Sequence, residues 1–112
     1  MKPGEFPPQY RSDKDNTGWL ERVHPVTLET LARSPDLPSG GHIWCGGVVA
    51  HANGDLYMVN GNYVHRLTPE CKVVAERKLP LDCAYNGLLI LSDGNLITKN
   101  LGHKPGQQCV FR

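Results

Sequence analysis

One pattern of residues occurs twice in this chain, and the two copies are 40 positions apart, as Gly54 and Gly94 show. The stretch "GGVVAHANGDLYMVN" occupies residues 46–60, and "NGLLILSDGNLITKN" occupies residues 86–100. In each copy an apolar run leads into a turn that ends in glycine, and a second apolar run follows. Two short apolar runs around such a turn predict a β-hairpin. A chain that repeats a hairpin at a fixed period is restricted to folds that stack copies of one small unit.

A second pattern repeats at an offset of 44 positions, from Pro25 to Pro69. The stretch "WLERVHP" at residues 19–25 is similar to "YVHRLTP" at residues 63–69. We predict that each is a strand ending at a proline turn, because proline removes a backbone donor, and that the chain then runs back as a second strand. A helix over residues 26–34 is the alternative, since the apolar residues there also fit a helical stripe.

One complete unit of four strands is predicted between these patterns. Its strands are short and antiparallel, and Gly, Asn, Asp and Pro mark the turns between them. We expect the Asn53-Gly54 turn to be of type I′, in which both central residues take positive φ. The predicted strands cover residues 46–52, 55–60, 63–67 and 71–79, and strands at 86–92 and 95–101 begin the next unit.

Four short antiparallel strands in about 40 residues are typical of one blade of a β-propeller. The sequence therefore predicts an all-β chain of antiparallel propeller blades that follows a flexible N-terminal arm at residues 1–16. Residues 17–38 form a partial blade in this interpretation, residues 46–80 a full blade and residues 86–112 a second partial blade. A small β-sandwich whose hairpins are similar by coincidence is the alternative.

The predicted blades form an incomplete ring, because a propeller needs roughly four to eight blades to close. Open strand edges at both ends would be available for pairing with another chain. Either the chain is a piece of a longer propeller, or copies of it associate as a homo-oligomer through their exposed strand edges.

Composition and charge narrow the expected partners and location. The chain has 112 residues, enough for one modest core, and a net charge of +1. Such a charge gives no basic footprint for nucleic acid, and no apolar run approaches the roughly 20 residues of a membrane span. The start, "MKPGEFPPQY", has no apolar signal core. We therefore expect a soluble, cytoplasmic protein that binds neither nucleic acid nor membranes.

The cysteines show no metal or redox spacing. None of the four forms a C-x-x-C pair, so the usual zinc and disulfide-exchange patterns are absent. A cytoplasmic location favours free thiols. The four residues are Cys45, Cys71, Cys83 and Cys109.

Three stretches resemble parts of known propellers. "ERVHPVTLETLARS" (residues 21–34) and "HRLTPECKVVAERKLP" (65–80) resemble the outer hairpins of propeller blades. "YNGLLILSDGNLITKN" (85–100) resembles the inner strands of the NHL and SMP-30/gluconolactonase-like propellers. The resemblance extends over residues 17–101 and implies a propeller fold.

The same resemblance implies one candidate metal ligand. In SMP-30-like lactonases an Asn that precedes Gly at the start of an inner strand helps to hold a divalent cation, and Asn86-Gly87 has that position here. A Ca²⁺ or Zn²⁺ cofactor would follow. The family usually has an aspartate near the end of the next strand, where this chain has Thr98-Lys99-Asn100. The ammonium of Lys99 would repel a cation there.

The glycine-rich stretch "GGHIWCGG" precedes the first inner strand and suggests a ligand site. In the functional interpretation His42, Trp44 and Asn86 line the mouth of the central channel and bind a protein or a small molecule. In the structural interpretation Trp44 packs between sheets and His42 caps a loop.

Other polar residues on the predicted strands have structural interpretations. His51 has Leu91 as its repeat equivalent, so its position does not require histidine, and we expect packing or solvent exposure there. His65 and Arg66 are expected to make surface ion pairs near Glu70.

Catalytic motifs are not evident. The chain has neither a G-x-S-x-G nucleophile elbow nor a phosphate-binding loop. We therefore expect a non-catalytic propeller segment that is a scaffold or a binding module and has no cofactor. The alternative is part of a metal-dependent hydrolase resembling the SMP-30/gluconolactonase lactonases, with Asn86 as one metal ligand.

Overall fold

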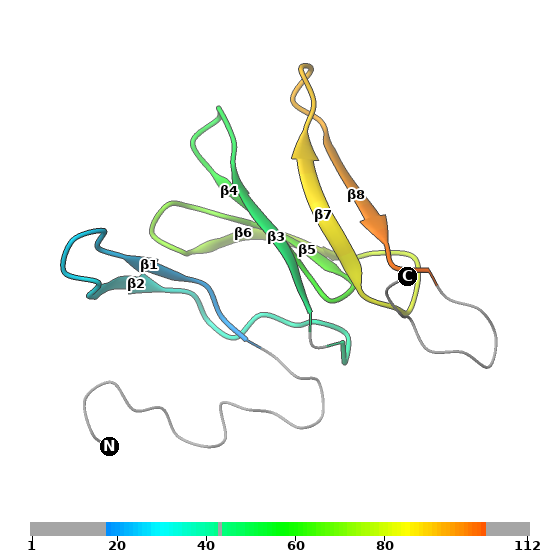
Figure 1. Cartoon of the computed structure of the whole chain (residues 1–112), viewed down its shortest axis with the longest axis horizontal. Helices are drawn as coiled ribbons and strands as arrows, with labels where there is room; N and C mark the ends of the chain where they lie inside the picture. Colours follow the sequence, from blue (N-terminus) through cyan, green and yellow to red (C-terminus); the bar gives the residue numbers. More distant parts are fainter. Residues whose placement is uncertain (1–17, 43, 103–112) are drawn as a thin grey trace.

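The computed structural model describes residues 18–42 and 44–102, and this part of the chain is all-β (Figure 1). The predicted N-terminal arm (1–16) and the end of the last predicted partial blade lie outside the described residues. No helix in the described part is long and apolar enough to cross a membrane. The eight strands are β1 (Glu21–Val23), β2 (Thr30–Arg33), β3 (Cys45–Ala50), β4 (Leu56–Asn60), β5 (Tyr63–Leu67), β6 (Val73–Lys78), β7 (Tyr85–Ile90) and β8 (Leu96–Asn100).

The strands form three antiparallel sheets. The central sheet has four strands in the order β3-β4-β5-β6, which confirms the predicted four-stranded unit. The pairs β1-β2 and β7-β8 lie on either side of it (Figure 1). The alternative helix over residues 26–34 is wrong, because residues 26–29 form a turn and loop and residues 30–33 form β2, which pairs with β1. Alternating contacts across the strands therefore prevail over the weak helical stripe.

The hairpins β3-β4 and β7-β8 are copies of each other in three dimensions. Val48 pairs with Met58 and Ala50 with Leu56, and 40 positions later Leu88 pairs with Thr98 and Ile90 with Leu96. Each pair has one register irregularity near its start. The repeat found in the sequence is therefore a repeat of strand pairing as well.

The turns of these two hairpins are alike, but they are not of the predicted type I′. In the first, His51 N–H donates to Asp55 O (2.9 Å), and Gly54, with φ 95°, donates to His51 O (3.0 Å). Asn53 does not take positive φ, because its side-chain oxygen accepts the Asp55 N–H (2.9 Å) and Gly54 alone supplies the left-handed residue. A three-residue loop of this kind matches strand twist as well as type I′ does.

The second turn follows the first, bond for bond. Leu91 N–H donates to Asn95 O (2.8 Å), Gly94 N–H donates to Leu91 O (2.9 Å), and Gly94 has φ 90°. Asp93 accepts the Asn95 N–H at 2.9 Å, as Asn53 accepts that of Asp55.

Apolar side chains are buried on both faces of the central sheet. On the face toward β1-β2, Met58 and Leu67 pack with Leu37, and Leu20 lies against them. The other face packs against β7-β8 through a larger cluster. Its members are Val59, Tyr85 and Leu88, with Val49, Tyr57, Val64, Leu79 and Leu96 partly buried around them. Each fully buried aliphatic side chain contributes about 1.5–3 kcal/mol, so these two clusters hold the three sheets together.

Candidate functional site

The beginnings of β3 and β7 lie against each other, although they are 40 positions apart. Figure 1 shows the two strands running in the same direction at the centre of the molecule. A Cβ atom added to Gly46 would overlap the backbone oxygen of Tyr85 and lie 3.1 Å from the Cα of Asn86. Glycine at position 46 therefore allows a direct backbone contact between the two inner strands. The contact brings the segments before both strands to one end of the molecule.

His42 joins these two segments. Its Nε2 atom lies 3.0 Å from Oδ1 of Asp82, which precedes β7 as His42 precedes β3. The His42 side chain is 27% exposed and that of Asp82 is 84% exposed. Solvent weakens an exposed pair of this kind, so the contact orients the imidazole more than it stabilises the fold. The pair therefore presents one imidazole ring and one carboxylate to solvent at this end of the molecule.

Trp44 and Asn86 occupy the starts of the inner strands, as the repeat predicts. Trp44 is partly buried, and its backbone oxygen accepts the N–H of Gly61 (2.6 Å). Asn86 is partly buried in β7 and pairs with Lys99 across the hairpin. The structure therefore places His42, Trp44 and Asn86 at the same end of β3 and β7. Whether they bind a ligand together stays a prediction.

The surroundings of Asn86 bear on the metal hypothesis. Directly opposed residues of an antiparallel pair lie on one face, so Lys99 shares the face of Asn86. The Lys99 ammonium donates to the backbone oxygen of Asn100 (2.9 Å). Among the described residues, no group of three or more His, Cys, Asp or Glu side chains could hold a metal ion.

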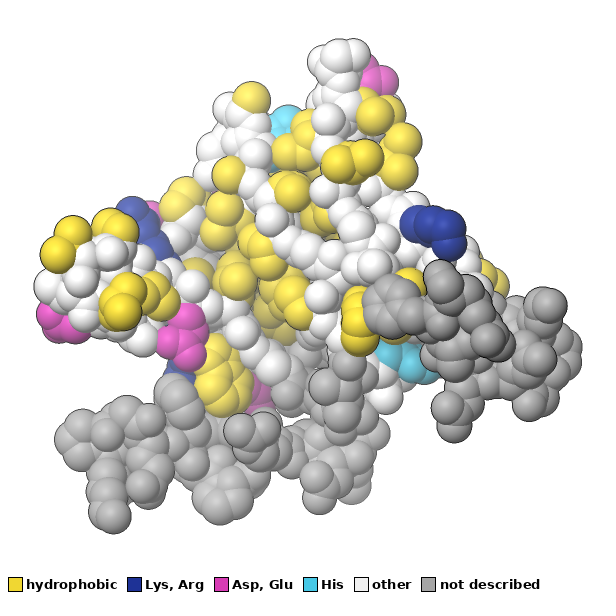
Figure 2. Space-filling model, viewed as in Figure 1, with side chains coloured by type: hydrophobic (Ala, Val, Ile, Leu, Met, Phe, Trp, Pro, Cys, Tyr) yellow, Lys and Arg dark blue, Asp and Glu magenta, His cyan; other side chains and the backbone are white. Residues whose placement is uncertain are grey.

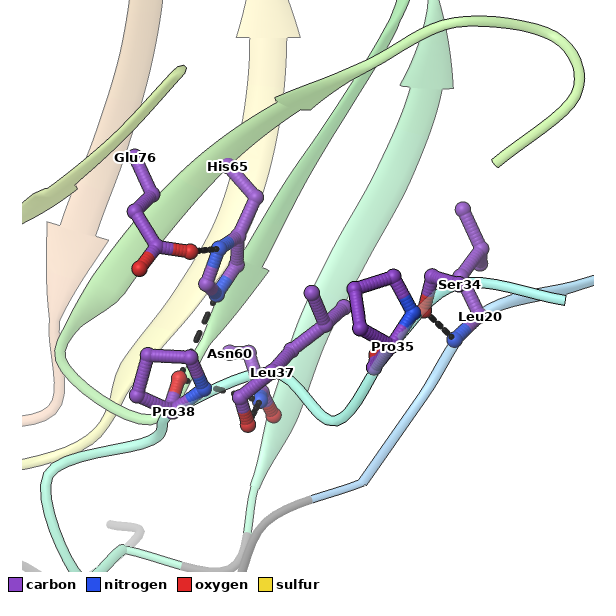
Figure 3. Close-up of polar contacts among 8 residues, drawn as sticks. All are labelled: Leu20, Ser34, Pro35, Leu37, Pro38, Asn60, His65 and Glu76. Atoms are coloured by element: carbon purple, nitrogen blue, oxygen red, sulfur yellow. Dashed lines mark hydrogen bonds and ion pairs between the residues drawn. The ribbon is translucent and has the colours of Figure 1, made fainter. Parts of the chain in front are cut away.

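His65 is not at the surface, and the expected ion pairs with Glu70 are wrong. The His65 side chain is fully buried; its Nε2 donates to Pro38 O (3.2 Å) and its Nδ1 lies 3.1 Å from Glu76 Oε1 (Figure 3). Glu70 instead pairs with Arg22 at 3.2 Å. The segment before β3 covers His65, and this contact between distant residues was not visible in the sequence. Strand alternation gave one signal, because His65 shares a face with buried Leu67.

Burial lowers the pKa of His65 below its usual 6.5, because removing the ring from water disfavours its charged form. The Glu76 carboxylate and the Pro38 oxygen oppose this shift. Glu76 is 40% exposed, so solvent screens its charge, and burial of the ring dominates. His65 has a structural role here, since it holds Pro38 in place.

Two buried asparagines also hold neighbouring segments in place through side-chain hydrogen bonds. Asn60 donates from Nδ2 to Leu37 O and Pro38 O, both at 3.3 Å (Figure 3). Asn62, fully buried in the β4-β5 turn, donates from Nδ2 to Leu81 O (3.2 Å). These side chains fix the segments that carry His42 and Asp82. The sequence indicated only a turn at this point, and the contacts depend on tertiary packing.

His51 links the tips of the two repeated hairpins. Its Nε2 atom donates to Gly94 O (2.9 Å), and its Nδ1 atom accepts the N–H of Asn53 (3.0 Å). Its ring is 5.4 Å from that of Tyr57, centroid to centroid. Of the two environments expected for His51, the structure therefore shows packing, with the ring partly buried.

Arg66 also has a different partner from the expected one. Its Nε atom donates to Asp55 Oδ2 at 2.6 Å, and its guanidinium carbon is 5.9 Å from the centre of the Tyr57 ring. These contacts raise the pKa of Arg66 above its ordinary value, chiefly through the hydrogen bond to Asp55. Arg66 therefore joins β5 to the start of β4 within the central sheet.

Two grooves flank the central sheet. One, of about 360 Å³, lies between β1 and the central sheet and includes Leu20, Val48 and Leu56. The other, of about 410 Å³, covers the outer half of the opposite face and includes Val64, Arg66, Ala75, Arg77 and Leu96. Neither groove includes His42, Trp44 or Asn86.

Cysteines in the described part form no disulfide. Cys45 is exposed, whereas Cys71 and Cys83 are buried. Burial also raises the pKa of the Cys71 thiol, since a thiolate is poorly solvated there. The expectation of unpaired cysteines is confirmed for these three positions, and Cys109 lies outside the described residues.

No protein-family model, curated protein or solved structure matches this chain. Function is therefore inferred from the geometry of the chain itself.

Proposed function

We propose that this chain is a segment of a β-propeller and acts as a non-catalytic scaffold or binding module. The observation that carries the proposal is the hairpin β7-β8, which copies β3-β4 in register and turn bonds and lies beside it. In a propeller the first strand of every blade lines the central channel, and neighbouring blades pack face to face. The close contact of Gly46 in β3 with Tyr85 and Asn86 in β7 supports this proposal.

The end of the molecule where β3 and β7 begin is the proposed binding end. His42, Trp44 and Asn86 would offer an imidazole, an indole and an amide to a ligand. These groups suit a small polar molecule or a protein loop, since a few convergent polar groups beside an aromatic ring are usual in such sites. Buried Asn60, Asn62 and His65 support the site by fixing the backbone behind it.

Binding at this end is tested by NMR. An ¹⁵N-labelled sample is titrated with a panel of small polar molecules and short peptides, and amide shifts are mapped. We expect binders to shift the amide signals of His42, Trp44 and Asn86. We expect His42→Ala to weaken the affinity for these binders about tenfold, as loss of one good contact implies. His24→Ala, at the distant β1-β2 turn, is the control. Binders that shift only other amides would contradict the proposal.

A metal-dependent lactonase resembling the SMP-30/gluconolactonase propellers is the second candidate. The observation in its favour is Asn86 followed by Gly87 (φ 81°) at the start of an inner strand. It predicts that Ca²⁺ or Zn²⁺ raises the melting temperature, because a ligand of the folded state stabilises it by mass action. Asn86→Ala should abolish this rise, and Asn95→Ala, at the hairpin tip, should preserve it. A melting temperature that neither metal changes would count against this candidate.

A further inference from the structure

In the described part of the chain, β8 and β1 each lack a partner on an edge that is paired in the equivalent strand of the central sheet. Within residues 18–42 and 44–102, β8 pairs only with β7, and β1 pairs only with β2. In the central sheet the corresponding strands β4 and β5 pair with each other. The chain thus has the inner half of a blade at one end and the outer half at the other.

The unpaired backbone groups of β8 can be assigned by alternation. At either end of β8, Asn95 O accepts the N–H of Leu91, and Leu101 N–H donates to Ala84 O. Backbone hydrogen bonds alternate along an antiparallel strand, so residues 97 and 99 also face β7. The N–H and C=O groups of Leu96 and Thr98 therefore point to the open edge, and the Asn100 oxygen at that edge accepts a hydrogen bond from Lys99 Nζ (2.9 Å).

The same alternation assigns the open edge of β1. Ser34 N–H donates to Leu20 O, and His24 N–H donates to Glu29 O, so residues 20 and 24 face β2. The groups of Glu21 and Val23 therefore point away from β2.

The central sheet shows how these two edges would fit. There Leu56 pairs with Leu67, Met58 with His65 and Asn60 with Tyr63. Adding 40 to the number of the first residue in each pair, and subtracting 44 from that of the second, gives the equivalent residues in β8 and β1. The first two pairs become Leu96 with Val23 and Thr98 with Glu21. These are the same four residues whose backbone groups are directed outward, so the edges match in register.

The uncovered sheet faces match as well. Leu89 and Ile97 on β7-β8 are 65% and 48% exposed, whereas their repeat equivalents Val49 and Tyr57 pack between two sheets. Figure 2 shows apolar side chains gathered over this hairpin. At the other end Val48 is 43% exposed, whereas its equivalent Leu88 is 8% exposed and lies in the same packed cluster. The exposed face of β7-β8 is thus equivalent to a buried face of the central sheet. The exposed face that carries Val48 is equivalent to the buried face of β7-β8. Within one chain, these two buried faces pack against each other.

We propose that copies of this chain associate head to tail, with β8 of one copy pairing with β1 of the next. The shared blade then consists of β7 and β8 from one copy and β1 and β2 from its neighbour. That neighbour's β1-β2 hairpin covers the groove lined by Val64, Arg66 and Leu96. The inference rests on the propeller arrangement proposed above, but it concerns strand pairing and needs no ligand.

The eight strands of residues 18–42 and 44–102 amount to two four-stranded blades per copy. A heterologous contact of this type closes into a ring when its rotation permits. Rings of roughly four, six or eight blades would need two, three or four copies. The expected species is therefore a closed oligomer of two to four copies by this estimate.

The first test is the mass of the 112-residue chain in solution, by size-exclusion chromatography with light scattering. Thr98→Pro should give a monomer, because proline removes the outward N–H of β8 and leaves the bonds to β7 intact. Thr98 Oγ1 also donates to Gly87 O (2.7 Å), so Thr98→Val is the control for that loss and should keep the oligomer. Circular dichroism establishes that both variants are folded.

A variant that changes no backbone group gives an independent measurement. Leu89→Lys places a charge on the exposed apolar face of β7 and should also reduce the mass. Val26→Lys, at an 81% exposed position in the β1-β2 turn, should not.

Mixing two blocked variants tests the head-to-tail geometry. Glu21→Pro blocks the β1 edge as Thr98→Pro blocks the β8 edge, and each variant alone should be monomeric. A mixture should form a 1:1 complex, because one copy supplies an open β8 and the other an open β1. Glu21→Gln is the control and should keep the oligomer.

A monomeric native chain, including one whose edges its own residues close, would overturn the inference. So would a dimer of Glu21→Pro alone, since that result indicates β8 pairing with β8. A monomer that binds ligands at His42 would leave the proposed binding function intact, and a ring that binds none would leave the pairing intact.

Discussion

Among the described residues, two other than glycine have left-handed backbones, and both lie in the proline turns. Leu28 has φ 65° and Cys71 has φ 67°. Leu28 N–H donates to His24 O, four residues back, and Cys71 N–H donates to Thr68 O, three residues back, so each residue closes its turn. A side chain at such φ costs roughly 1–2 kcal/mol. At position 71 burial of the thiol offsets this cost, but Leu28 is 72% exposed.

Leu28→Gly should therefore stabilise the protein by about 0.5–1 kcal/mol, the left-handed cost less the backbone entropy of glycine. Chemical unfolding at fixed protein concentration measures the change. Val26→Gly is the matched control, because Val26 is 81% exposed in the same turn and has no positive φ. It should destabilise, and an equal loss in both variants would refute the assigned strain.

The buried ring of His65 makes stability depend on pH. Because its pKa in the folded state is lowered from 6.5, the unfolded state binds more protons between the lowered value and 6.5. Stability is therefore fully present above about pH 6.5 and decreases as the pH falls toward the lowered pKa. The Pro38 carbonyl and the Glu76 carboxylate can both only accept hydrogen bonds, so the charged ring donates to both and the neutral ring donates to one of them.

Glu76→Gln should lower the pKa of His65 further, because the carboxylate is the charge that opposes burial. The acid-induced loss of stability should then extend to lower pH. An NMR titration of the His65 ring measures the pKa, and ¹⁵N shifts identify the tautomer. Glu29→Gln, on the exposed turn, is the control. A pKa that rises in Glu76→Gln would show that the carboxylate does not act as described.

At the scale of elements, the hairpins could be predicted from the sequence. Period-two alternation and Gly, Asn, Asp or Pro turns are local signals, and every predicted hairpin is present. The turn type was not predicted, because Asn53 hydrogen-bonds the backbone with its own side chain and leaves only Gly54 left-handed. Which strands lie next to each other was predicted only through the repeat.

The contact of β3 with β7 gives a prediction for Gly46. Gly46→Ala should destabilise by roughly 1–3 kcal/mol, since its Cβ would overlap the backbone oxygen of Tyr85, which has little freedom to move. Gly18→Ala is the control, because nothing lies within 4 Å of its Cβ position. Thermal and chemical unfolding of both variants provide the comparison. Equal stability of the two would mean that β3 and β7 are further apart than described.

At the scale of the whole molecule, β7-β8 packs against one face of the central sheet, and Leu20 and Leu37 cover only part of its other face. Exposed apolar residues such as Leu89 and Val48 mark the uncovered faces. If copies cover them, folding is linked to association and the melting temperature should rise with protein concentration. Thr98→Pro should melt at one temperature at all concentrations. Differential scanning fluorimetry over a hundredfold range tests this, and a concentration-independent melt of the native chain would contradict it.

Part of the proposed binding site could be predicted from local sequence signals, and part depends on contacts between distant segments. Trp44 was expected in the loop before a strand and Asn86 at the start of one, and they lie just before β3 and near the start of β7. The contact of His42 with Asp82 joins two segments 40 positions apart. The residue pattern within each segment does not indicate this contact.

The sequence by itself determined the strands, the hairpins and their repeat, because alternation and turn chemistry act between residues close along the chain. Only the tertiary structure decided that His65 is buried under Pro38, that Arg66 bonds Asp55, and that Gly46 meets Tyr85. Those outcomes depend on which distant segments exclude water together. Burial and pairing between such segments are properties of the packed sheets, and residue order alone does not specify them.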